Sequence, residues 1–214
     1  MSHGSSNVDA KILALEANVD CTAVLDNHEA VTGTRKGELT IWSMRTGKQL
    51  RQLVAPPTGY STLQRSGRSP PATMANAHTG EVKAVQISRD GKFLVSASAD
   101  TTLKIWNLET EKLSSTLKGH TDEVWCCTIS SDDDMVVSGS RDGTIRLWKS
   151  AGGQLTSLFN AGVDIFSVRL SSDKRTIVAL GDKFATRKLV MLQIVHTRTK
   201  GGGSRATSPL PVHY

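Results

Sequence analysis

The sequence predicts an all-β fold built from repeated units of four short strands. Three observations support this prediction: landmark residues recur at a fixed spacing, Gly, Ser and Asp turns separate short apolar stretches, and helical periodicity is almost absent. The 214 residues are 38% hydrophobic and 21% charged, which is enough for one or two ordinary domains with a sizeable core. No run of 18 apolar residues occurs, and residues 1–10 lack the apolar core of a signal peptide, so no membrane contact is expected.

The central observation is a repeat of 42 residues in the middle of the chain. Three residue types, a His, an Asp and a Trp, each recur once at this spacing. The pairs are His78 and His120, Asp100 and Asp142, and Trp106 and Trp148. A period near 42 residues is the length of one four-stranded propeller blade. We therefore expect residues 76–117 and 118–159 to be two consecutive blades of a β-propeller.

The strands of the second of these units can be read from its sequence. Stretches rich in Val, Ile, Thr and Trp cover residues 124–129, 135–138, 144–148 and 154–159. Between them lie turns rich in Ser, Asp and Gly, including Arg141-Asp142-Gly143. Four short strands with such turns are typical of a blade.

A weaker copy of the unit precedes this pair. In residues 10–55, Ala30–Thr34 and Glu38–Trp42 resemble the second and third strands of a blade, so this region is expected to be a degenerate first blade. Residues 56–75 are rich in Pro, Ser, Thr and Gly and predict a flexible inserted loop. Residues 1–9 are expected to be disordered.

A second weak copy follows the pair. Residues 160–195 predict a degenerate fourth blade without a Trp, with three strands over 165–170, 176–180 and 189–194. The polar, Gly-rich and basic residues 196–214 are expected to form a disordered tail.

At this point the residues resemble a known family. Gly119-His120, the Ser-Gly-Ser-Arg-Asp-Gly turn at 138–143 and Leu147-Trp148 resemble the WD40 repeat, most strongly over residues 76–159. The family's closing Trp-Asp pair is absent, because Ser, Asn and Lys follow the three repeat tryptophans. The weak final blade also resembles the C-terminal end of the propellers attached to NACHT-type NTPases.

The resemblance implies a hydrogen-bonded tetrad of His, Ser, Asp and Trp in each well-formed blade. The tetrads would be His78, Ser96, Asp100 and Trp106, and His120, Ser138, Asp142 and Trp148. A buried Trp has one N–H donor and no acceptor, so it needs an acceptor nearby. A strand Ser satisfies it by accepting this hydrogen bond, and the Ser hydroxyl in turn donates a hydrogen bond to His. In the first blade Thr32 and Trp42 remain, but Lys36 takes the Asp position. This blade is therefore expected to be less stable than the other two.

The same residue types also make up the catalytic triad of serine hydrolases. A triad is needed once in an enzyme, whereas His120, Ser138 and Asp142 repeat a set found 42 residues earlier, each time with a Trp. The repetition favours a structural role. No phosphate-binding loop or metal-ligand spacing accompanies it, so we expect no enzymatic activity, no cofactor and no metal.

Cysteine usage bears on the compartment. Cys21, Cys126 and Cys127 are an odd number, and two of them are adjacent. This is neither a disulfide framework nor a metal-ligand pattern and indicates a reducing intracellular compartment. A cytoplasmic location is expected, with a nuclear one left open.

The resemblance also implies where partners bind. In the family, the loops before the first strand and between the second and third strands form one face of the disc. The residues that the repeat alignment brings to this face are Glu81, Lys83, Ala99, Glu123, Trp125, Arg141, Asp164 and Phe166. Trp and Arg dominate binding energy at protein interfaces. We therefore expect a non-enzymatic scaffold for other proteins; the alternative for Trp125 is an aromatic side chain packed between blades.

The net charge of +6 is concentrated in two segments without acidic residues. Their basic residues are Arg65, Arg68, Arg198, Lys200 and Arg205, which supply +5 of this charge. Because both segments are expected to be disordered, a solvated linker is favoured over nucleic-acid binding. A propeller associated with nucleic acid through its basic tail is the alternative function. Ser69 and Ser208, each followed by Pro, are candidate phosphorylation sites.

Four blades leave the closure of the ring unexplained, since propellers of this family usually close with about seven. An open arc exposes two end faces to water. Lys11–Leu15 resembles a lone strand that could complete the fourth blade. The sequence favours a fragment or short isoform of a longer propeller protein, ahead of a dimer that forms an eight-bladed ring and of a closed four-bladed monomer.

Overall fold

The computed structural model describes residues 19–26, 28–56, 76–183 and 186–194. All the regular secondary structure in these ranges consists of β-strands, which form four antiparallel sheets. This confirms the all-β prediction. Across this described part of the chain, no helix has the length and apolar character needed to cross a bilayer.

The four sheets follow the chain, and we refer to them as blades 1 to 4. Blade 1 contains β1 (Val19–Val24), β2 (Glu29–Thr34), β3 (Leu39–Ser43) and β4 (Gln49–Leu53). Blade 2 contains β5 (Val82–Ile87), β6 (Phe93–Ser98), β7 (Leu103–Asn107) and β8 (Lys112–Leu117). Blade 3 contains β9 (Val124–Ile129), β10 (Met135–Ser140), β11 (Thr144–Lys149) and β12 (Leu155–Asn160). Blade 4 contains β13 (Asp164–Leu170), β14 (Thr176–Lys183) and β15 (Thr186–Gln193).

Within each blade, strands that follow one another in sequence pair antiparallel, so each blade is a simple meander. Short turns make this possible. Gly37 and Gly143, in the turns between the second and third strands of blades 1 and 3, have φ of +80° and +77°. Residues with a Cβ rarely adopt this conformation, which explains why Gly occupies both turns.

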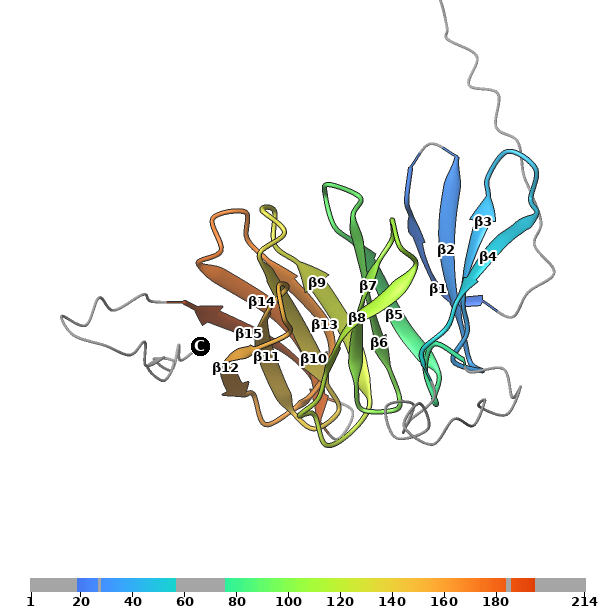
Figure 1. The fold of residues 1–214 in the computed structure, drawn as a ribbon. Coiled ribbons are helices and arrows are strands. Elements are labelled where there is room, and N and C mark those ends of the chain that lie inside the picture. The colour runs from blue at the N-terminus through green and yellow to red at the C-terminus, as the bar shows by residue number, and fades with distance from the viewer. Residues whose placement is uncertain (1–18, 27, 57–75, 184–185, 195–214) are drawn as a thin grey trace, which may run out of the picture.

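The blades stack in chain order through their first strands. β1 contacts β5, β5 contacts β9, and β9 contacts β13. Blade 1 and blade 4 lie at opposite ends of the row (Figure 1), so the row is open. The structure is therefore a partial propeller and not the closed four-bladed ring considered above. Lys11–Leu15, the strand proposed to close such a ring, lies outside the described residues.

Each pair of neighbouring blades shares an apolar core, which we call a joint. Alternate residues of a strand face opposite sides of its sheet, so one side of a blade meets the preceding blade and the other side meets the next. The side that carries the Trp faces the preceding blade: Trp106 packs in the first joint and Trp148 in the second, and both are at most 1% exposed. The third joint is built around Ile165, Val168 and Ile177.

One cysteine packs in each joint. In the first joint, the Cys21 thiol donates to the Val82 carbonyl oxygen at 3.3 Å. Cys127 packs in the second joint and Cys126 in the third, where its sulfur lies 3.9 Å from the Ile165 carbonyl oxygen. All three thiols are free. Cys126 and Cys127, which are adjacent on β9, thus pack in two different joints.

Loops at one edge of the blades reinforce the stacking. The Asp133 carboxylate in blade 3 accepts hydrogen bonds from the backbone N–H groups of Arg89 and Asp90 in blade 2, at 2.8 and 3.0 Å. Asp132 forms an ion pair with Lys174 in blade 4. Polar contacts thus tie blade 3 to both of its neighbours.

Candidate functional site

The four side chains of the predicted blade 2 tetrad lie within hydrogen-bonding distance of one another. Ser96 on β6 is 2.7 Å from Nε2 of His78, and its hydroxyl oxygen accepts the indole N–H of Trp106 at 3.0 Å. Nδ1 of His78 is 2.8 Å from the Asp100 carboxylate. The arrangement satisfies the buried indole, hydroxyl and imidazole in one chain of bonds.

Blade 3 repeats this geometry. Ser138 is 2.8 Å from Nε2 of His120 and 2.9 Å from the indole nitrogen of Trp148, and Nδ1 of His120 is 2.8 Å from Asp142. The side chain of Ser138 is fully buried, as is that of its counterpart Ser96. A nucleophile must be reachable by substrate, so neither hydroxyl is positioned to attack one.

Burial and hydrogen bonding shift the titration of the tetrads. Burial lowers the pKa of His78 and of His120, which favours their neutral form. Burial alone would raise the pKa of Asp142, but hydrogen bonds from Thr144 and His120 outweigh this effect and lower the pKa to about 2. Asp100 is likewise held below its usual pKa by His78. Each tetrad therefore combines a neutral His with an ionised Asp.

Blade 1 retains only half of a tetrad. Trp42 donates to the Thr32 hydroxyl at 2.7 Å, and exposed Lys36 stands at the position of Asp100 and Asp142. Trp42 is also partly exposed, because within the described residues no blade covers its side of the sheet. A hollow of about 680 Å³ lies there instead, bordered by Trp42 and Thr32.

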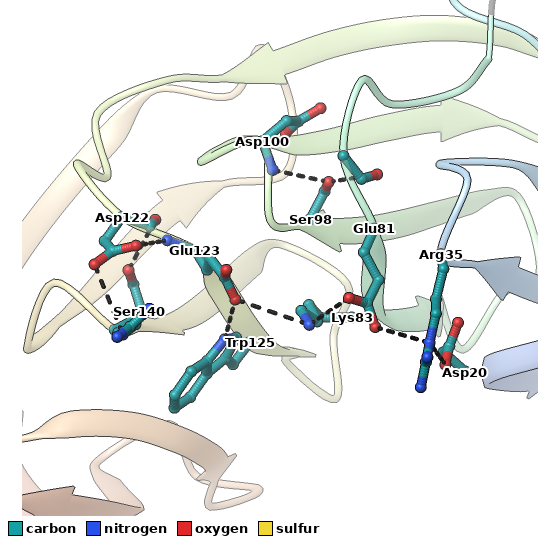
Figure 2. Close-up of polar contacts among 12 residues, drawn as sticks. Asp20, Arg35, Glu81, Lys83, Ser98, Asp100, Asp122, Glu123, Trp125 and Ser140 are labelled. Carbon is teal, nitrogen blue, oxygen red and sulfur yellow. Dashed lines mark hydrogen bonds and ion pairs between the residues drawn. The ribbon is translucent and has the colours of Figure 1, made fainter.

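A β-bulge occurs at the same place in all four first strands. Pairing with the second strand skips one residue in each blade: Asp20, Lys83, Trp125 and Phe166. A bulge turns a side chain out of the regular alternation of a strand. The side chains of Asp20, Lys83 and Trp125 form a row across blades 1 to 3 (Figure 2). We call the surface that carries the four residues the bulge face.

Charged side chains connect the bulge residues of blades 1 and 2. Nε of Arg35 lies 3.1 Å from the Asp20 carboxylate and 4.0 Å from the Glu81 carboxylate. Nζ of Lys83 lies 2.7 Å from Glu81 and 3.8 Å from Glu123 of blade 3. Opposite charges thus alternate along the bulge face from blade 1 to blade 3 (Figure 2).

The row of charges ends at an aromatic side chain. Trp125 donates its indole N–H to the Glu123 carboxylate at 2.7 Å and is partly buried. It borders a hollow of about 630 Å³ together with Phe166 of blade 4. The other lining residues are Asp164, Asp182, Lys183 and Arg187. An aromatic, partly apolar recess with charges around it is a suitable place for a side chain of a partner.

The remaining residues predicted for this face lie beside the same row. Nε of exposed Arg141 is 3.9 Å from the carboxylates of both Asp122 and Asp164. Ala99 contributes its backbone, whose N–H donates to the Glu81 carbonyl oxygen at 2.8 Å. The described structure thus brings all of the predicted face residues to neighbouring positions.

Sequence reasoning missed several members of this face. Asp20 was missed because β1 has no clear apolar alternation, and Arg35 because its turn was recognised only as a strand connection. Asp182 and Arg187 belong to a β14–β15 hairpin that extends beyond the strands predicted for blade 4. The alignment of Asp20 with Lys83 and Trp125 at the bulge is the signal that would have identified it.

Two further predictions concern binding of ions and modification. Among the described residues, His, Cys, Asp and Glu side chains form no cluster of three or more that could hold a metal ion. Ser69 and Ser208, the candidate phosphorylation sites, lie outside the described residues.

Comparison with known proteins agrees with this architecture. The sequence profile of the family described as "WD domain, G-beta repeat" matches residues 69–107 and 111–149. These ranges contain the first three strands of blades 2 and 3 and all four residues of each tetrad. The matches carry the two strongest copies of the repeat and leave the outer blades unmatched.

Curated relatives are similar over less than half of the chain. Eukaryotic translation initiation factor 3 subunit I of Culex quinquefasciatus is 33% identical over 88 residues, which are 41% of this chain and 20% of that protein. Protein HIR1 of Eremothecium gossypii is 33% identical over 39% of this chain and 10% of its own length. Target of rapamycin complex subunit LST8-1 of Arabidopsis thaliana is 30% identical over 46% and 27%, respectively.

The chain thus matches between about a tenth and a quarter of the length of these relatives. The matched repeats, the four stacked antiparallel sheets and the two tetrads all point to the same assignment. The chain therefore carries two WD repeats, at residues 69–107 and 111–149, within an all-β structure like a partial propeller.

Proposed function

We propose that the protein is a non-enzymatic scaffold that binds other proteins through the bulge face. The observation that carries this proposal is the position of one bulge residue per blade on a single surface, ending in the recess between Trp125 and Phe166. Two of the relatives are named as subunits of a larger factor or complex, which supports protein partners. The buried hydroxyls of Ser96 and Ser138 support the absence of hydrolase chemistry.

The chemistry of the face suits recognition. Trp125 is held in one orientation by Glu123, which is in turn near Lys83. A pre-oriented side chain loses less conformational freedom when a partner binds. Exposed ion pairs contribute little to folding, so the alternating charges along the row serve specificity and orientation of a partner better than stability.

The experiment compares partner recovery by three variants of the full chain. Proteins captured from a cell lysate are quantified by mass spectrometry for the wild type, Trp125→Ala, Phe166→Ala and, as a control, Leu155→Ala, which removes a 41% exposed side chain of β12. Partners of the bulge face are expected to fall by about thirtyfold with either aromatic variant, as for a central contact residue. They should be unchanged with the control.

A melting curve separates binding from the packing alternative for Trp125. Under the proposal, Trp125→Ala leaves the melting temperature nearly unchanged. Equal recovery of all captured proteins by every variant, or a large loss of stability in Trp125→Ala, would contradict the proposed role.

The nucleic-acid alternative rests on residues outside the described structure, since Arg65, Arg68 and residues 196–214 carry the basic excess. It predicts salt-sensitive retention of RNA or DNA that is lost when residues 196–214 are deleted. We propose a cytoplasmic location, with a nuclear one left open. We also propose that this row of blades is part of a longer propeller.

A further inference from the structure

The recess between Trp125 and Phe166 lies over the third joint. Trp125 occupies the bulge of β9 in blade 3, Phe166 occupies the bulge of β13 in blade 4, and these two strands contact each other. The β14–β15 hairpin of blade 4 supplies further lining residues, among them Asp182 and Arg187. The two aromatic walls of the recess therefore come from blades that pack against each other, and not from the uncovered side of an outer blade.

The two rings offer apolar surface with no open polar atom. The indole N–H of Trp125 is already bonded to the Glu123 carboxylate at 2.7 Å, and the ring extends away from the row of charged side chains (Figure 2). Phe166 has no polar atom in its side chain, and both residues are only partly buried. A ligand in the recess therefore meets the faces and edges of two aromatic rings.

The charged residues around the rings balance one another. Asp164 lies 3.9 Å from Nε of Arg141, and Asp182 is the cross-strand partner of Arg187. Opposite charges at such positions attract each other. The lining contains two acids, Asp164 and Asp182, and two bases, Lys183 and Arg187, so their formal charges sum to zero. A cation could stack on the rings, but the recess has no surplus negative charge to offset the loss of its hydration.

We propose that the recess binds an uncharged aromatic side chain, a tyrosine, of a partner protein. This inference rests on the proposed function of the bulge face and names the group that the face recognises. The hollow of about 630 Å³ is within the range of sites that hold small organic groups. The balanced charges favour a neutral occupant, and the two rings favour an apolar one.

Two features favour tyrosine over other apolar side chains. Aromatic rings that meet edge to face or in offset stacks gain more than the burial of their area alone provides, and Trp125 and Phe166 both allow such contacts. The carboxylate of Asp164 stands beside the rings with its side chain 46% exposed, so it can accept the O–H of a phenol. Tyrosine has both the ring and the donor, whereas phenylalanine has only the ring and leucine has neither.

Fluorine NMR of the full chain labelled with fluorotryptophan tests the proposal. The sequence contains four tryptophans, so four signals are expected, and the one that is missing in Trp125→Phe belongs to Trp125. N-acetyltyrosinamide should shift this signal with half-saturation on the order of 1–10 mM, as for a single side chain without its protein. N-acetylphenylalaninamide should bind about threefold more weakly, and N-acetylleucinamide and N-acetylargininamide at least about tenfold more weakly.

Variants of the recess separate a neutral occupant from a charged one. Phe166→Leu keeps most of the apolar volume and hence the fold, and it should weaken binding of N-acetyltyrosinamide by about fivefold. Asp164→Asn removes a charge but keeps an acceptor, so it should change this binding by less than about threefold. Leu155→Ala, on exposed β12, is the control and should leave the titration unchanged.

Three results would overturn the assignment of tyrosine. These are binding of N-acetylargininamide or N-acetylleucinamide as tight as that of N-acetyltyrosinamide, a shift of the Trp42 signal in place of that of Trp125, and no shift with any of the four amides. If partner recovery from the lysate still depends on Trp125 in these cases, the bulge face remains a binding site and only the tyrosine is wrong. Recovery that does not depend on Trp125 contradicts the proposed function itself, whatever the amides do.

Discussion

Each tetrad joins three parts of a blade through one serine hydroxyl. Ser138 on β10 accepts from Trp148 on β11 and bonds His120, which lies ahead of β9 and reaches Asp142 in the turn after β10. Removing one member leaves the buried group that it bonded without that partner, and this costs more than the bond itself. The tetrad therefore fixes the geometry between strands as well as adding stability.

Asp142→Ala is expected to lower the free energy of unfolding by about 1–3 kcal/mol, because His120 loses the acceptor of its Nδ1–H. Urea denaturation of the variant measures this loss. Asp134→Ala, at an exposed position of the neighbouring loop, is the control and should stay within about 0.5 kcal/mol of the wild type. Equal stability of Asp142→Ala and wild type would show that the tetrad is dispensable.

The shifted pKa values make the fold sensitive to acid. The pKa of His78 and of His120 is lowered by burial from the usual 6.5, so unfolding lets both residues take up protons. Stability should therefore fall as the pH drops below about 6.5, with a slope of up to about 1.4 kcal/mol per pH unit for each histidine. Protonation of Asp142 adds a further loss between its usual value of 3.8 and about 2.

Denaturation at a series of pH values between neutral and mildly acidic measures this slope. The variant His120→Gln should have a shallower slope than the wild type, whatever its stability at neutral pH. Stability that increases on acidification would contradict the neutral state of the buried histidines.

At the residue scale, repetition decided what the sequence could predict. His78 and His120 were identified with their partners because both sets keep the same spacing, and their side chains lie within hydrogen-bonding distance. The face residues were located by alignment, but the bulge that aims Trp125 is a property of strand pairing. Neither composition nor period reveals a one-residue shift in register.

At the scale of elements, the glycines Gly33 and Gly139 in the second strands of blades 1 and 3 let the next blade approach closely, because a Cβ there would overlap Val82 or Ile165. Gly139→Ala is expected to destabilise the protein by about 1–3 kcal/mol, because the added methyl group overlaps Ile165 in the third joint. Thermal unfolding measures the effect. Leu158→Ala on β12, a change at a 47% exposed side chain, provides the control and should have a small effect. A wild-type melting temperature for Gly139→Ala would mean that the third joint accommodates the added methyl group without loss of stability.

The central strands could be predicted closely from their alternation and turns. The strands predicted at 124–129 and 144–148 correspond to β9 and β11. β1 and β4 were not predicted, since their mixed polar composition reflects one exposed side. The length of the β14–β15 hairpin was also underestimated, because its outer apolar residues are not covered within the described chain.

At the scale of the whole molecule, the blades differ in how many neighbours support them. Blades 2 and 3 are packed on both sides and carry complete tetrads, whereas blade 1 has one neighbouring blade among the described residues and half a tetrad. In stacked repeats, stability is close to a sum of internal and neighbour contributions. Amide hydrogen exchange should therefore be at least about tenfold faster in β2 and β3 than in β6 and β7. Uniform protection of all blades would indicate that blade 1 gains support elsewhere.

The number of blades could be counted from the sequence, but their closure could not. Whether a row of blades closes depends on contacts between its first and last blades, which are far apart in the sequence and follow no repeat period.

Because one cysteine lies in each joint, the reaction of its thiol can report when that joint opens. Burial raises the pKa of Cys21 and of Cys126 to about 12, and it also raises the pKa of Cys127, so almost no thiolate exists while the sheets stay together. Since each sulfur lies between a different pair of blades, alkylation of each thiol reports separation of the two blades at its own joint. We therefore expect the three thiols to be alkylated in the order in which their joints open during unfolding.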